Sequence, residues 1–242
     1  MGGWVVCATL AASTAFPASI TMYQNGGYSY GDGGEFTAYT SPDDFLDYYT
    51  PKTIVNGGFE TFCVELYVNF YPGAAYSFNI SDTDSQGRAL TAGAALLYYD
   101  FAKGILPGYD YNAGSGRSLS AGELQAAIWL LQGDQVNSGF PTGGPGNPFY
   151  DYAASVLGTN DVTAANNGLY DVHIMELWNS DGGAAQNQLV ISGVPDTGTT
   201  AGLLGLGVVA VVAARRKMES QPKLIPIRMR RQHRPLDGRH SR

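Results

Sequence analysis

The most regular hydrophobic pattern in the chain lies between residues 120 and 133. Apolar side chains recur there at intervals of three and four positions, at Leu124, Ala127, Ile128 and Leu131. This spacing predicts a helix that buries one stripe of its surface. Ser120 with Glu123 three residues later is typical of an N-terminal capping box, and Gly133 suits the left-handed residue that ends a helix. Gln125 falls at the margin of the buried stripe, one turn before Trp129, so we expect it to be partly desolvated.

A second pattern, between residues 59 and 70, alternates with a period of two. Apolar residues occupy every second position there, which predicts a strand with one buried face. Cys63 falls on the more polar face, so its side chain is expected to point away from the core. Further strands are predicted at residues 35–39, 76–80, 169–178 and 187–191, the last two as a hairpin, and a second amphipathic helix is predicted at residues 90–106.

These elements predict an α+β domain over residues 19–191. Strands from both ends of the domain, arranged as a β-sandwich or barrel, are expected to enclose two to three helices, and one hydrophobic helix is expected at residues 201–217. The chain has 242 residues with 32 Gly, 16 Tyr, 10 Phe and only 14% charged residues, which is typical of an extracellular protein with one hydrophobic core. Residues 1–18 are apolar and rich in small residues but lack the usual basic start, which predicts a truncated secretory signal peptide.

Cysteine content and charge narrow the classes of function. Removal of the signal peptide would take Cys7 with it and leave Cys63 as the sole cysteine in an oxidising compartment, where it has no partner for an internal disulfide. Residues 1–214 contain nineteen acidic and four basic side chains. This balance argues against nucleic-acid binding by the domain, because phosphate contacts need clustered basic residues.

No cofactor and no metal ion is expected. Asp82 and Asp84 resemble the start of a calcium-binding loop, but the twelfth position holds Gly93 where such a loop requires a glutamate. We therefore interpret this segment as a solvated turn.

The C-terminal region has three parts. Residues 192–200 form a short polar linker, residues 201–214 are apolar and uncharged, and residues 215–217 are basic. The apolar run is shorter than the roughly 20 residues that cross a bilayer comfortably. Under the positive-inside rule the basic cluster would stay cytoplasmic, which places residues 19–200 outside the cell.

This order of segments resembles the sorting tag of PEP-CTERM proteins, in its Val-Pro-Asp variant. The residues that carry the resemblance are Val194, Pro195, Asp196, Arg215 and Arg216. It implies transient membrane insertion through residues 201–217, removal of the tail by an exosortase-type membrane protease, and delivery to the surface of a Gram-negative bacterium. Residues 218–242 continue as a basic tail, which departs from the usual pattern of the family.

The sequence Phe-Cys-Val-Glu at 62–65, followed by Leu-Gln-Ala-Ala-Ile-Trp at 124–129, resembles the paired signature of bacterial thioester domains. The resemblance extends over roughly residues 19–191. It implies that the Cys63 sulfur displaces ammonia from the Gln125 carboxamide and leaves an internal thioester, with Trp129 as shielding. An amine or hydroxyl on a surface polymer or protein would later open this bond, as in an adhesin and without a cofactor. Gln132 is the rival acyl donor.

Two other functions fit the same sequence. A matrix protein that binds exopolysaccharide without a thioester could use tyrosines such as Tyr109 and Tyr111 to stack on sugars. A cysteine hydrolase would need His173, the only histidine before the C-terminal tail, beside Cys63. No recognisable nucleophile motif surrounds Cys63, so we expect a protein that is not an enzyme.

Overall fold

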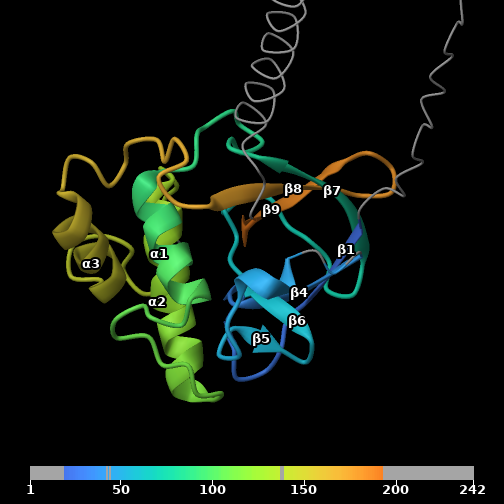
Figure 1. Ribbon diagram of the computed structural model, residues 1–242, viewed down its shortest axis with the longest axis horizontal. Helices are drawn as coiled ribbons and strands as arrows, with labels where there is room; N and C mark the ends of the chain where they lie inside the picture. The colour runs from blue at the N-terminus through green and yellow to red at the C-terminus, as the bar shows by residue number, and fades with distance from the viewer. Residues whose placement is uncertain (1–18, 42, 44, 137–138, 193–242) are drawn as a thin grey trace, which may run out of the picture. The chain divides into compact units, whose positions relative to one another are not determined.

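The computed structural model describes residues 19–41, 43, 45–136 and 139–192, which form an α+β unit (Figure 1). The strands are β1 (Ser19–Tyr23), β2 (Ser29–Tyr30), β3 (Gly33–Gly34), β4 (Phe36–Ser41), β5 (Ile54–Val55), β6 (Gly58–Thr61), β7 (Ala75–Ser81), β8 (Val172–Trp178) and β9 (Ala184–Ile191). The helices are α1 (Ala92–Ala102), α2 (Ser115–Leu131) and α3 (Pro148–Leu157), with a 3-10 turn at Leu46–Tyr48. The signal peptide predicted for residues 1–18 and the sorting segment after residue 192 lie outside the described residues.

The predicted α+β class is confirmed, but the layering differs from the prediction. The helices pack against one another on one side of the sheet, so the strands do not enclose them (Figure 1). The core lies between these two layers and contains a dense group of aromatic rings, among them Phe62, Tyr98, Phe101 and Trp129, each at most 1% exposed. Within the described residues, no helix is long and apolar enough to span a membrane.

Seven of the strands form one antiparallel sheet in the order β5-β6-β4-β1-β7-β8-β9. The chain beyond β6 then pairs with β9, the far edge of the sheet. The Val64 N–H donates to the Asn187 carbonyl at 2.9 Å, and the Leu189 N–H donates to the Phe62 carbonyl at 3.0 Å. These bonds close the sheet on itself, so β9 has partners on both sides.

The strand predicted for residues 59–70 is wrong beyond Thr61. Strand β6 ends at Thr61, and Cys63 follows as a single bridge to Gln188. Residues 62–65 are all buried, whichever way they point, because this segment passes between β9 and α2. The orientation of a segment that is buried on both faces cannot be predicted from a period-two pattern, because that pattern assumes one solvent-exposed face.

Helix α2 carries the predicted buried stripe but starts earlier than predicted. It begins at Ser115 after Gly114, so Ser120 lies inside it, and the Ser120 hydroxyl accepts from the Asp110 N–H at 3.2 Å. The predicted capping box is therefore wrong. The predicted end is confirmed: Gly133 has φ of +88°, and the Asp134 N–H closes the last turn onto the Trp129 carbonyl.

The other two helices begin at side-chain caps. Helix α1, which is shorter than predicted, starts at Thr91, whose hydroxyl accepts from the Ala94 N–H, and it packs against α2 as expected. Helix α3 was not predicted. Asn147 caps it through two backbone N–H groups and Pro148 occupies its first turn, an Asn-Pro pair that is a helix-start signal in the sequence.

Candidate functional site

Cys63 lies where the sheet closes, with β9 on one side and α2 on the other. In its bridge to Gln188, the flanking residues Phe62 and Val64 make the hydrogen bonds to β9. The N–H and C=O of Cys63 itself therefore point away from β9. They point toward α2, which supplies the partner for both groups.

That partner is the side chain of Gln125, which lies on α2 and is fully buried. The Cys63 N–H donates to Gln125 Oε1 at 3.0 Å, and Gln125 Nε2 donates to the Cys63 carbonyl at 2.8 Å. The primary amide thus pairs with Cys63 as a neighbouring strand would. The two residues singled out by the sequence are 62 positions apart in the chain and are in direct contact.

The prediction that Cys63 faces away from the core is wrong. Its side chain is fully buried within the hydrophobic core, and burial raises the pKa of the thiol, which is therefore protonated at neutral pH. Gln188 Nε2 lies 3.6 Å from the sulfur as a hydrogen-bond donor and opposes this rise in pKa. Gln188 was not predicted as a site residue, and because Gln186 and Asn187 precede it in β9, its polarity alone did not single it out.

Two carboxylates hold residues 62–66 in place around Cys63. The Asp134 carboxylate, just after α2, accepts from the Leu66 N–H at 2.9 Å and pairs with Arg88 at 2.7 Å. The Glu65 carboxylate accepts from the backbone and hydroxyl of Ser85. Helix α2 and the turn after it therefore contact this segment at two points, through Gln125 and through Asp134, which limits how far the amide can move relative to the sulfur.

Trp129 lies one turn after Gln125 on α2 and is 1% exposed. The Phe140 ring packs edge-on against its indole with 4.9 Å between ring centroids. A Cβ at Gly33 would meet the indole at 2.9 Å and the Phe140 ring at 2.8 Å, so only glycine fits at that point of the hairpin β2–β3. Trp129 is thus covered from two sides, and Phe140 is a part of this cover that the sequence did not indicate.

The residues on which the alternative hypotheses depend lie away from Cys63 or make other contacts. Gln132 Oε1 accepts from the Thr91 N–H at 2.7 Å, so this side chain caps the start of α1. His173 Nδ1 lies 2.7 Å from Asp82, and no hydrogen bond joins it to Cys63 among the described residues. Tyr109 is 7% exposed and Tyr111 is half-buried, so neither is the open stacking surface that the sequence suggested.

The turn at residues 82–88 is better ordered than a solvated turn. Asp84 is 2% exposed and accepts from the N–H groups of Gln86 and Arg88 and from the Arg88 side chain. Its carboxylate is thus occupied by donors from its own turn. No group of three or more potential metal ligands occurs in the part of the chain that the structure describes.

A second buried polar cluster includes Glu60 of β6. Arg117 of α2 makes two bonds of 2.7 Å to Glu35, to which the Tyr109 hydroxyl also donates, and Glu60 accepts from Thr37 at 2.5 Å. Burial, with Glu35 nearby, raises the pKa of Glu60 well above its ordinary value. Burial also raises the pKa of Glu35, although Arg117 opposes it. The cluster accordingly holds more carboxyl groups than cations and retains a proton.

Comparison with known proteins finds a match in the C-terminal segment. Residues 193–218 match the family model described as the VPDSG-CTERM motif, a sorting signal related to PEP-CTERM. This match covers Val194, Pro195, Asp196, Arg215 and Arg216, all outside the described residues. No curated protein and no solved structure matches the chain significantly. The motif indicates an exported, surface-targeted protein that a dedicated sorting enzyme processes.

Proposed function

We propose that this exported surface protein acts like an adhesin, through an internal thioester between the Cys63 sulfur and the side-chain carbonyl of Gln125. The observation that carries the proposal is the reciprocal pair of hydrogen bonds between the Gln125 amide and the Cys63 backbone. It holds the amide against the residue that bears the thiol, in a site where both side chains are fully buried. Such fixed proximity replaces an encounter in solution and favours the reaction.

The bond would form by acyl transfer within the chain. The Cys63 sulfur attacks Cδ of Gln125, the C–N bond breaks, and the thiol proton passes to the departing nitrogen, which leaves as ammonia. The Cys63 N–H already donates to Oε1 and is placed to stabilise the negative charge that develops there. Because burial raises the pKa of the thiol, the sulfur gives up its proton only as it attacks, and the leaving group takes up that proton.

The product would be protected until a partner arrives. The buried site excludes water, which would otherwise hydrolyse the thioester, and Trp129 with Phe140 covers the helix turn beyond Gln125. An amine or hydroxyl of a surface polymer or protein would attack the carbonyl carbon, form an amide or ester to Gln125 and release the Cys63 thiol. No cofactor enters either step.

The sorting signal supports a location outside the cell for this chemistry. We infer that the enzyme which processes residues 193–218 is an exosortase-type membrane protease and that residues 201–217 insert in the membrane only transiently. The thioester would then be presented outside the cell, where polymers with amines and hydroxyls are its partners.

The test is the intact mass of gently purified protein. The mass should fall short of the sequence by one ammonia, and both Cys63→Ala and Gln125→Ala should abolish the deficit, whereas Gln132→Ala should keep it. Methylamine should add to the wild-type protein alone and liberate one thiol. A full mass together with a Cys63 thiol that reacts after denaturation would refute the cross-link, and an unchanged deficit in Gln125→Ala would refute the assigned acyl donor.

A further inference from the structure

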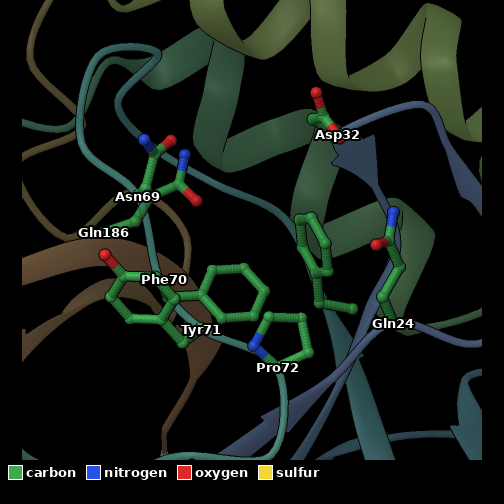
Figure 2. A pocket seen from close by; sticks show the side chains of 8 residues that line it. Gln24, Asp32, Asn69, Phe70, Tyr71, Pro72 and Gln186 are labelled. Carbon is green, nitrogen blue, oxygen red and sulfur yellow. The ribbon is translucent and has the colours of Figure 1, made fainter.

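A hollow of about 310 Å³ opens on the surface beside the Cys63 segment (Figure 2). Its lining comes from the segment between β1 and β4, from β4 itself, from the loop after Cys63 and from β9. The lining residues are Gln24, Asp32, Phe36, Asn69, Phe70, Tyr71, Pro72 and Gln186. Carboxamides, a carboxylate and aromatic rings thus surround one small space.

The polar side chains of the hollow retain free hydrogen-bonding capacity. Gln186 is 5% exposed and uses its Nε2 on the Glu65 carbonyl at 2.7 Å, and its Oε1 has no hydrogen bond to the described residues. The side chains of Asn69 and Asp32 likewise make no hydrogen bond within the described part of the chain. Figure 2 shows Asn69 and Gln186 next to one another on one wall and Asp32 across the hollow.

The aromatic part is a ring on a fixed backbone. Tyr71 is 72% exposed, which is unusual for so large a side chain. Its N–H donates to the Tyr76 hydroxyl at 2.6 Å and its carbonyl accepts from the same hydroxyl at 3.1 Å, and Tyr76 is 1% exposed. Phe70 next to it packs edge-on against Phe36 at 4.7 Å between centroids. The loop is therefore fastened to the core while the Tyr71 side chain stays open to solvent.

The charge of the lining selects among ligands. It contains one carboxylate and no lysine or arginine, so phosphate, sulfate or uronate groups would be repelled. A purely apolar ligand would leave the Asn69 carboxamide and the free side-chain oxygen of Gln186 without partners, which costs free energy. Neutral sugar rings carry no negative charge that would be repelled. Their hydroxyls pair with amides and carboxylates, while their C–H face packs on an aromatic ring.

We propose that this hollow binds a neutral polysaccharide through one or two pyranose units, with Tyr71 as the stacking surface. It lies close to the site of the cross-link: the amide nitrogen of Gln188 is 3.2 Å from the Gln186 carbonyl and 3.6 Å from the Cys63 sulfur. If the thioester forms as proposed above, the hollow is where its acceptor docks. That second role rests on the proposed function, whereas binding itself does not.

The test uses the Cys63→Ala protein, which has no sulfur at residue 63 and can only bind reversibly. Titration calorimetry with cellohexaose and maltohexaose should give saturable binding to at least one of them, and hexagalacturonate should not bind. Tyr71→Ala should weaken binding about tenfold or more. Tyr67→Ala is the matched control, because Tyr67 is 71% exposed on the same loop but does not line the hollow.

The outcomes separate this inference from the thioester. Failure of both neutral oligosaccharides to bind, or an equal loss in Tyr67→Ala and Tyr71→Ala, overturns the saccharide site even if the mass deficit is found in the wild-type protein. Tighter binding of hexagalacturonate also overturns it. Saturable binding that depends on Tyr71, in protein whose wild-type form has a full mass, supports the saccharide site and removes only its role in cross-linking.

Discussion

Replacement of Gln125 tests how much of the fold depends on one side-chain amide. In a Cys63→Ala background no thioester can form, so Gln125→Ala then measures the non-covalent role of the side chain, chiefly its two bonds to the backbone of residue 63. Each buried backbone group left without a partner costs about 1–3 kcal/mol, so the free energy of unfolding should fall by about 2–6 kcal/mol. The cavity left by the side chain adds to this loss. A whole domain is stable by only about 5–15 kcal/mol, so the loss is large.

The assay is urea unfolding monitored by circular dichroism. The free energies of unfolding are compared between variants whose m-values are equal. Glu123→Ala in the same background is the control, because Glu123 is a partly exposed residue of α2 whose side chain makes no hydrogen bond to the described residues, and it should change stability by less than about 0.5 kcal/mol. If the alanine variant does not fold, Gln125→Glu serves instead: it should regain stability at low pH, where a protonated carboxyl can donate to the Cys63 carbonyl. A loss below about 1 kcal/mol in Gln125→Ala would refute the structural role of this amide.

Four further predictions concern Glu60, Cys63, His173 and the C-terminal motif. Burial raises the pKa of Glu60 above its ordinary value of 4.5, so the folded protein keeps this proton where the unfolded chain loses it. The free energy of unfolding should therefore fall, relative to Glu60→Gln, by about 1.4 kcal/mol for each pH unit above that value. Equal pH profiles of stability in the two proteins would contradict this. Cys63→Ser should be less stable than Cys63→Ala by about 1–2 kcal/mol, because a hydroxyl replaces a thiol in the core, and chemical denaturation would reveal the opposite order if Cys63 were exposed. His173→Ala should leave the mass deficit intact, and its disappearance would restore a role for this histidine beside Cys63. Peptide mapping of surface-extracted protein should find no peptides beyond Arg216, and their recovery from most molecules would argue against processing.

The sequence predicted the elements that depend on short-range signals. The stripe on α2, the end of that helix at Gly133 and the hairpin of β8 and β9 are all found, because local spacing and turn chemistry determine them. The contact between Cys63 and Gln125 was also anticipated, through short motifs rather than through periodicity. The prediction of export rests on the C-terminal motif and did not require the structure.

The remaining features depend on tertiary contacts that local patterns do not encode. Cys63 was placed on a polar face because its neighbours alternate, yet closure of the sheet buries both faces there. Ser120 fits a helix cap but lies in the second turn of α2, since the chain continues the helix back to Gly114. Gln188 and Phe140 join the site from distant segments, and the hollow around Tyr71 is assembled from four separate parts of the chain.

Closure of the sheet also sets an order of events during secretion. The closing bonds join residues 62–64 to β9, and Cys63 and Gln188 are 125 residues apart in the chain. Contacts of such long range form late, because a large loop must be closed before they contribute. A chain that crosses the membrane with its N-terminus first would expose Cys63 and Gln125 well before β9 emerges. The site therefore reaches its folded geometry only when nearly the whole domain is outside, and the proposed thioester would not form while the chain is still among the amines of the cytoplasm.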